Sequence, residues 1–286
     1  MSNDPGPAPA PARLIDIHSH LDGFSDAEVG DILARAEAVG VRTIVTAGTT
    51  LDASKRAVRL AETHGSLFAA VGIHPSDLTG PVNDETERAL VALAASERVV
   101  AISEIGLDFQ ERSPDRAVQY QAFRSQIGIA RELGLPIVFH SREAPQDTLR
   151  VLREERGFEV GGAMHYFQEN SDVARDAIDL GFHISLARQL LRLPKLQAVA
   201  KELPMEWVVL ETDAYPQPFK KQADRRTEPR HVAEVAAELA RLKDVSVEQI
   251  AEQTTANALA LFGPLGPALA WPKGHQSRTG PKAPEK

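Results

Sequence analysis

The stretch Ile15-Asp16-Ile17-His18-Ser19-His20-Leu21-Asp22 decides the expected fold, because it joins the end of a strand to two histidines. The apolar run from Leu14 to Ile17 is typical of a buried strand. Residues i and i+2 of a strand point the same way, so His18 and His20 can both reach one ion. Neutral imidazole is the commonest metal-ligand side chain. The alternative is two unrelated polar residues where a strand becomes a loop, and only further ligands elsewhere can decide.

Seven more apolar runs follow along the chain, and stretches with helical periodicity separate them. Strands that alternate with helices predict a parallel sheet, and eight such repeats in 286 residues predict an α/β fold, the closed (β/α)8 TIM barrel. A doubly wound open sheet is the alternative, but it needs a ligand crevice at one switch point. Here polar residues follow many strands instead. The later strands are expected at residues 41–46, 67–71, 98–103, 137–139, 159–164, 182–185 and 206–210.

The composition is that of a globular protein, with 43% apolar and 25% charged residues. The chain has no run of about 18 apolar residues, so we expect no membrane span. Its first residues lack the basic start and apolar core of a signal peptide. Cysteine is absent, which excludes disulfides and suits a reducing compartment, so we expect a cytoplasmic protein. We expect one barrel domain at 13–262 between disordered tails at 1–12 and 263–286.

Histidines and carboxylates gather at the predicted carboxyl ends of the strands. In a barrel these ends meet at one mouth, where barrel enzymes keep their active sites. Four histidines and two carboxylates, leaving His74 aside, suit two divalent ions about 3.5–4 Å apart with a bridging group. Glu104 is the natural bridge, because a carboxylate has two oxygens and this one lies mid-way in the strand order. The strand-end residues are His18, His20, His74, Glu104, His140, His165 and Asp213.

Six short motifs occur in order along the chain: His-Ser-His-Leu-Asp at 18–22, Gly-Ile-His-Pro at 72–75, Glu-Ile-Gly-Leu-Asp at 104–108, Leu-Pro-Ile-Val-Phe-His-Ser-Arg at 135–142, Met-His-Tyr-Phe at 164–167 and Glu-Thr-Asp-Ala at 211–214. As a set, spread over about residues 13–262, they resemble the signature series of the TatD family of metal-dependent hydrolases. The resemblance implies a TIM barrel of the amidohydrolase superfamily and metal-dependent deoxyribonuclease activity, typically exonucleolytic. It also implies a ligand set: His18, His20 and Asp213 for the first metal, Glu104 as the bridge, and His140 and His165 for the second.

Three positions depart from the pattern of that family. Ser103 stands where a glycine usually precedes the bridging glutamate, and Thr227 stands where an asparagine is common. Tyr166-Phe167-Gln168-Glu169 replaces the usual Cys-Phe-Ser-Gly. No metal position is altered, so the departures bear on substrate preference more than on the chemistry.

Further residues are candidates for catalysis and orientation. Asp213 follows Glu211 by two residues, so both carboxylates can face the mouth, and the resemblance makes Asp213 the general base. His74 and Arg142 are candidate contacts for substrate phosphate, the alternatives being a structural loop histidine and a surface ion pair. We expect Asp22 to orient a ligand histidine.

A basic cluster follows Asp213 closely in the sequence. The net charge of −8 requires any nucleic acid to be bound through such a local patch. On the loop after the last strand it would lie at the rim of the mouth, where barrels often hold phosphate, unless the loop is merely solvated. The cluster is Lys220, Lys221, Arg225 and Arg226. The aromatic candidates for the mouth are Phe24, Tyr166, Phe167, Tyr215 and Phe219.

The leading expectation is a two-metal phosphodiesterase that acts on DNA, single-stranded or at 3′ ends, with a metal-activated water as nucleophile. Mg²⁺ or Mn²⁺ is the expected cofactor, and mixed histidine and carboxylate ligation also admits Zn²⁺. The alternative is hydrolysis of an ester, lactone or amide at the same centre, for example deacylation of an aminoacyl adduct. A non-catalytic metal-bound scaffold fits a complete ligand set less well. We expect no membrane and no obligate protein partner.

Overall fold

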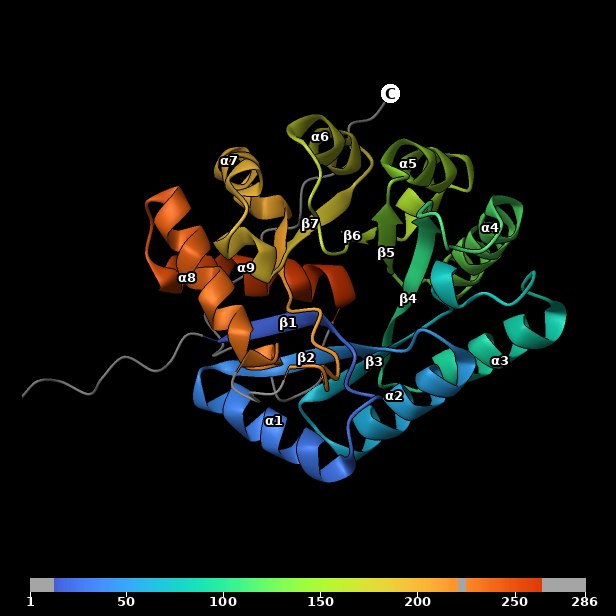
Figure 1. The fold of residues 1–286 in the computed structure, drawn as a ribbon, viewed down its shortest axis with the longest axis horizontal. Helices are drawn as coiled ribbons and strands as arrows, with labels where there is room; N and C mark the ends of the chain where they lie inside the picture. Colours follow the sequence, from blue (N-terminus) through green and yellow to red (C-terminus); the bar gives the residue numbers. More distant parts are fainter. Residues whose placement is uncertain (1–12, 221–224, 264–286) are drawn as a thin grey trace, which may run out of the picture.

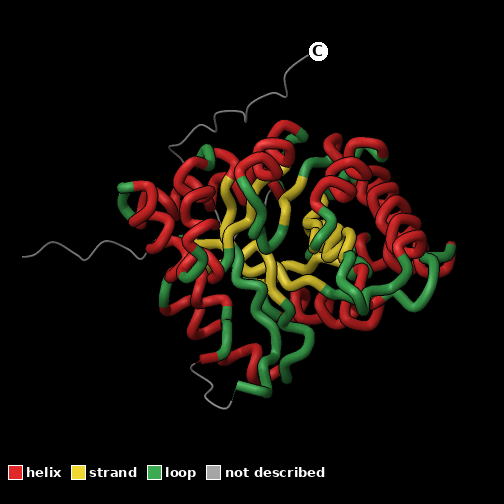
Figure 2. The backbone as a smooth tube through the Cα atoms, turned by 45° about the horizontal axis from the view of Figure 1, so that its top comes forward, coloured by secondary structure: helices red, strands yellow, loops and turns green. Residues whose placement is uncertain are grey.

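Eight parallel strands form a barrel in the computed structural model, which describes residues 13–220 and 225–263. Each strand pairs with the next in chain order, from β1 to β8. The helices surround the strands, as Figures 1 and 2 show. The predicted (β/α)8 barrel is therefore confirmed. The strands are β1 (Leu14–Ser19), β2 (Val41–Ala47), β3 (Leu67–Val71), β4 (Val99–Asp108), β5 (Ile137–Arg142), β6 (Gly162–Met164), β7 (Phe182–Leu186) and β8 (Val208–Leu210).

The helices begin at residues suited to the first turn. Ser25 caps the first helix with a capping box, and Ser246 caps the last in the same way. The α-helices are α1 (Asp26–Ala38), α2 (Leu51–Thr63), α3 (Asp84–Ala94), α4 (Arg116–Leu133), α5 (Pro145–Glu154), α6 (Ser171–Asp179), α7 (Pro194–Glu202), α8 (Val232–Lys243) and α9 (Val247–Phe262). Short 3-10 helices are η1 (Pro75–Asp77), η2 (Gly157–Glu159), η3 (Arg188–Leu191), η4 (Met205–Trp207) and η6 (Pro229–His231). Among the described residues, no helix is both long and apolar enough to cross a bilayer.

Several predicted boundaries were wrong. Strand β4 continues to Asp108, five residues beyond the predicted end at Ser103, because Glu104 lies inside the barrel wall instead of after it. The predicted sixth and eighth strands began too early, since 157–159 and 205–207 form 3-10 turns. The predicted tails at 1–12 and 263–286 fall outside the described residues, except for Gly263.

Two strands bulge where they carry site residues. On β4, Ile102 pairs with Ile137 and Ile105 with Phe139, so three steps on β4 match two on β5. The same mismatch occurs on β1, around His18. A bulge re-aims side chains and is common beside active sites. It lets Glu104 and His18 turn toward the mouth of the barrel while the strands continue.

The first and last strands meet at a junction that we call the seam, formed by residues 16–20 and 211–214. The backbone N–H of Asp213 donates to the carbonyl of His18 at 3.0 Å, and that of His20 donates to Ala214 at 2.6 Å. The buried Asp16 carboxylate accepts from the hydroxyl of Thr212 and, at 3.0 Å, from its backbone N–H. The seam therefore closes the barrel and brings Asp213, the last candidate ligand in the sequence, next to His18 and His20, the first two.

Candidate metal centre

A pocket of about 740 Å³ opens at the carboxyl ends of the strands. All the predicted strand-end residues except His18 line it, and Asp108, Tyr166, Arg192 and Tyr215 are among the other residues of its lining. Cavities of this size commonly hold small ligands. The pocket lies where barrel enzymes have their active sites.

Glu104 lies in the middle of the histidines, and its two oxygens face different partners. Oε2 lies 3.4 Å from Nε2 of both His18 and His20. Oε1 lies 2.9 Å from Nδ1 of His140 and 3.3 Å from Nε2 of His165. Burial opposes ionisation of Glu104, but the charges of the surrounding imidazoles, His165 first, hold its pKa well below the usual range.

His18 and His20 converge from the end of β1, as the i and i+2 spacing predicts. Their Nε2 atoms lie 3.1 Å apart. Nδ1 of His20 lies 2.9 Å from the carbonyl of Ala47, which can only accept, so this nitrogen carries a proton. Burial opposes a charged His20, but Asp213 and Glu104 outweigh it and raise the pKa of the imidazole in the metal-free protein, so Nε2 presents a lone pair only once its own proton is lost. The carbonyl of Ala47 orients this ring. The expected orienting role of Asp22 stays a prediction.

The carboxylate of Glu211 lies on the far side of the His165 ring from Glu104. The sequence had suggested that Glu211 faces the mouth of the barrel. Glu211 is fully buried and accepts from Nδ1 of His165 at 3.0 Å, which leaves Nε2 facing Glu104. Glu211 also accepts from the backbone N–H of Tyr166 at 2.7 Å and from the hydroxyl of Ser185 at 2.6 Å. Burial opposes a charged His165, but Glu211 and Glu104 outweigh it and raise the imidazole pKa to about 9 in the metal-free protein.

His140 lies between two carboxylates. Its Nδ1 faces Glu104 and its Nε2 lies 3.1 Å from Oδ2 of Asp108. The backbone N–H of Gln110 and the hydroxyl of Ser113 hold the other oxygen of Asp108, at 3.0 and 2.8 Å. Asp108 therefore fixes the ring so that Nδ1 points at the centre. The sequence analysis missed this role, although Asp108 is part of the quoted motif.

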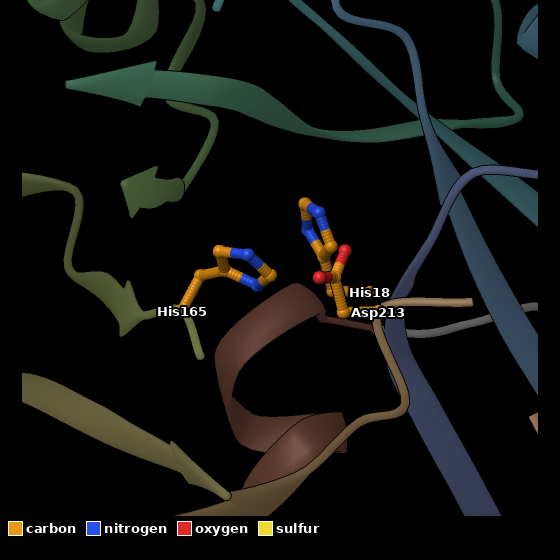
Figure 3. Close-up of side chains that lie close together, drawn as sticks. All are labelled: His18, His165 and Asp213. Carbon is orange, nitrogen blue, oxygen red and sulfur yellow. The ribbon is translucent and has the colours of Figure 1, made fainter. Parts of the chain in front are cut away.

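Asp213 completes the group from the seam. Its Oδ1 lies 3.3 Å from Nε2 of His20, and its backbone has a φ of 50°. A non-glycine residue in this left-handed region is uncommon, and such residues concentrate at functional sites. Burial opposes ionisation, but the hydrogen bond with His20 and the charge of His165 lower the pKa of Asp213. Figure 3 shows its carboxylate beside His18, with His165 facing them from the end of β6.

His74 differs from His20 and His165 in whether Nδ1, which faces a backbone or carboxylate partner outside the centre in all three, donates or accepts. Its Nδ1 accepts from the backbone N–H of Ser76 at 3.1 Å, so neutral imidazole carries its proton on Nε2. That Nε2 lies 3.5 Å from Oε1 of Glu104. His74 is thus set up as a hydrogen-bond donor at the edge of the centre, rather than as a ligand through Nε2.

The arrangement fits divalent metal ions. Three sets of donor atoms each lie within 4.8 Å of one another: His18, His165 and Asp213; His18, His20 and Glu104; His74, Glu104 and His140. Imidazole nitrogens directed inward around ionised carboxylates form a donor set for such ions, which would bind as the imidazoles release their protons. The outer partners Ala47, Glu211 and Asp108 hold the rings in the way that partners of metal-ligating histidines do.

The predicted substrate contacts divide into two groups. His74 and Arg142 line the pocket, and Arg142 lies beside the side-chain amide of Gln110. Lys220, Arg225 and Arg226 are not among the residues that line it, and Lys221 lies outside the described residues. Of the predicted aromatics, Tyr166, Phe167 and Tyr215 line the pocket, whereas Phe24 packs against the core and Phe219 is exposed. Arg192, after β7, lines the pocket without any sequence signal that marked it.

Comparisons with known proteins agree with the geometry. The sequence profile of the TatD-related DNase family matches residues 15–263. An uncharacterized metal-dependent hydrolase of Bacillus subtilis, YabD, is 36% identical over 87% of this chain and 98% of its own length. The 3′-5′ ssDNA/RNA exonuclease TatD of Citrobacter koseri is 34% identical over 82% of this chain and 92% of its own. The crystal structure of the Escherichia coli TatD homologue YJJV superposes with a TM-score of 0.78 at 29% identity, covering 88% of this chain and 98% of that one. The chain therefore belongs to the TatD family and is a metal-dependent hydrolase of that type.

Proposed function

We propose that this hydrolase is a two-metal phosphodiesterase that degrades single-stranded DNA from its 3′ end. The observation that carries the proposal is the position of Glu104, whose two oxygens face two different groups of imidazoles. A carboxylate placed in this way is suited to bridging two ions. The ligands would be His18, His20 and Asp213 on one side, with His140 and His165 on the other.

Mg²⁺ or Mn²⁺ is the cofactor that we favour, and the histidine-rich donor set also accommodates Zn²⁺. When bound, two such ions would stabilise the charge that develops on the attacking and leaving oxygens of a displacement at phosphorus.

The chain's own residues supply the proton transfers and contacts around that displacement. Asp213 is held ionised, so its carboxylate can accept the proton of the attacking water. His74 carries its proton on Nε2 and donates it in a hydrogen bond to a phosphate oxygen. Arg142, on the same pocket wall as His140, neutralises phosphate charge. The predicted basic cluster, Lys220 with Lys221, Arg225 and Arg226, would add longer-range attraction.

The choice of DNA rests on two further points. The matched family profile is that of DNases, and one relative is named as a 3′-5′ exonuclease of single-stranded DNA and RNA. The pocket also contains two arginines, Arg142 and Arg192, on a chain whose net charge is −8. Cations at the mouth of an acidic protein suit a polyanion that must be attracted locally.

The test is degradation of single-stranded DNA labelled at either end by protein stripped of metal and reloaded with Mg²⁺, Mn²⁺ or Zn²⁺. We expect activity only after reloading, with 3′-labelled strands losing their label first. Asp213→Asn should lose most activity, whereas Asp179→Asn, at the exposed end of α6, should retain it. Metal-loaded protein that leaves DNA intact but hydrolyses an ester or lactone would contradict the proposal and support the alternative substrate class.

A further inference from the structure

Exposed apolar side chains gather on the two loops that follow β7 and β8. Among the described residues only six large hydrophobic side chains are exposed, and three of them lie on these loops. They are Leu191 (38% exposed), Tyr215 (41%) and Phe219 (68%). Exposed apolar clusters on an otherwise polar surface commonly mark binding sites.

Cations accompany these side chains. Burial and the positive charges of Arg188 and Arg192 lower the pKa of Lys220, so the three groups lie near one another. Arg188 is paired with Glu234 at 3.0 Å, whereas Arg192 has no carboxylate within ion-pair distance in the described parts of the chain. The charges of Arg192 and Lys220, which lie near each other and have no ion-pair partner among the described residues, suit an anionic ligand.

This patch is continuous with the metal centre. Arg192 and Tyr215 line the same pocket as Glu104 and Asp213, and Phe219 and Lys220 continue the loop beyond Tyr215. The walls after β5 and β6 instead contribute two acids, Glu143 and Glu169. Among the lining residues Arg142 is the only arginine or lysine on the β5 and β6 side, so the two acids leave a polyanion less attracted there than along the loops after β7 and β8.

The patch includes Lys220 from the basic cluster that the sequence indicated, but not Arg226. The guanidinium of Arg226 donates to the backbone carbonyl of Lys220 at 3.3 Å, and its charge acts on Glu28 at the start of α1. Arg226 thus lies near the start of α1, and it does not line the pocket. Of the described members of the cluster, Lys220 lies near the arginines after β7.

We propose that a single-stranded nucleic acid reaches the pocket across the loops after β7 and β8, with Arg192 and Lys220 against its phosphates and Tyr215 and Phe219 against its bases. We call these four residues the strand path. Single-strand binding sites combine a cationic track with aromatic side chains in this way, and stacking tolerates any base. The inference rests on the proposed function and specifies which face of the enzyme the substrate occupies.

The strand path is tested by comparing a single strand of about twelve nucleotides with a dinucleotide, which has only two bases and one internal phosphate to offer the four residues of the path. Metal-loaded protein is assayed for kcat/KM on both substrates across a salt titration. Phe219→Ser should lower kcat/KM for the long strand roughly 5- to 150-fold and that for the dinucleotide much less. Arg192→Gln and Lys220→Gln should each flatten the logarithmic salt dependence for the long strand by about 0.7.

Lys195→Gln and Val245→Ser are matched controls, because both side chains are exposed and lie off the path. They should leave both substrates unaffected. Equal losses on the long strand and the dinucleotide, or no loss on either, would overturn the strand path while wild-type cleavage upholds the proposed function. Wild-type protein that degrades neither substrate would contradict the proposed function, and the strand path with it.

Discussion

Replacing Glu211 by glutamine tests whether the carboxylate behind His165 controls the metal centre. The carboxylate accepts from Nδ1 of His165, from the N–H of Tyr166 and from the hydroxyl of Ser185. An amide of the same shape turns one acceptor into a donor and leaves at least one buried donor unpaired, at a cost of about 1–3 kcal/mol. Loss of such an outer partner typically weakens metal binding about 10- to 100-fold.

The same substitution has a pH signature in the metal-free protein. Glu211 and Glu104 raise the pKa of His165 from 6.5 to about 9, which is worth roughly 3 kcal/mol of stability. Because the folded pKa is raised, this contribution is fully present below pH 6.5 and is lost as the pH rises through about 9. The penalty of Glu211→Gln on the free energy of unfolding should therefore be larger near pH 6 than near pH 9.5.

Two assays measure these effects: titration of apoprotein with Mn²⁺ or Zn²⁺, and urea unfolding in excess chelator at both pH values. Glu132→Gln, which removes an exposed carboxylate from α4, is the control and should change neither result. Wild-type metal affinity in Glu211→Gln, together with an unfolding penalty independent of pH, would refute the assigned role.

Five further outcomes are expected. Exhaustive chelation, with metal loss confirmed by elemental analysis, should abolish hydrolysis, and unchanged activity would exclude the proposed chemistry. Asp213→Asn should keep much of its metal and lose about 10²- to 10⁴-fold in kcat, so near-normal turnover would remove Asp213 as the base. Glu104→Ala should lower metal occupancy at both positions, and a full complement of bound metal would rule out the bridge. Gly106→Ala should destabilise the protein by roughly 2–6 kcal/mol in urea unfolding, because its φ is 149° and a Cβ would lie 2.0 Å from the carbonyl oxygen of His140. Gly128→Ala on α4, where a Cβ meets nothing within 4 Å, should be stabilising by about 0.5–1 kcal/mol.

The barrel and the members of the candidate centre could be predicted because both depend on local patterns. Apolar runs alternating with helical stretches specify the eight strands, and a polar residue after an apolar run marks a strand end. The predicted end of β4 at Ser103 was wrong because it too relied on a local pattern. Glu104 and Gly106 look like the start of a loop, yet the bulge and the close approach of Gly106 to β5 keep the strand paired to Asp108.

The orientation of each side chain could not be predicted, because it depends on partners distant in the sequence. Glu211 and Asp213 are two residues apart, but Glu211 turns inward to His165 while Asp213 lines the pocket. The donor role of His74 follows from one backbone N–H, that of Ser76. Arg192 carries no motif, and only the packing of η3 places it at the pocket.

The seam has a consequence for how the enzyme is made. Asp16 and Thr212, which are hydrogen-bonded across it, lie 196 residues apart in the sequence. A contact with so large a loop to close forms late in folding. A nascent chain that has not yet emerged beyond β8 therefore lacks Asp213, one of the three residues proposed with the bridge Glu104 for the first ion site, although His18 and His20 were synthesised near the start. If the proposed ligand set holds, the first ion site, and with it hydrolytic activity, is completed only when β8 has been translated and the barrel has closed.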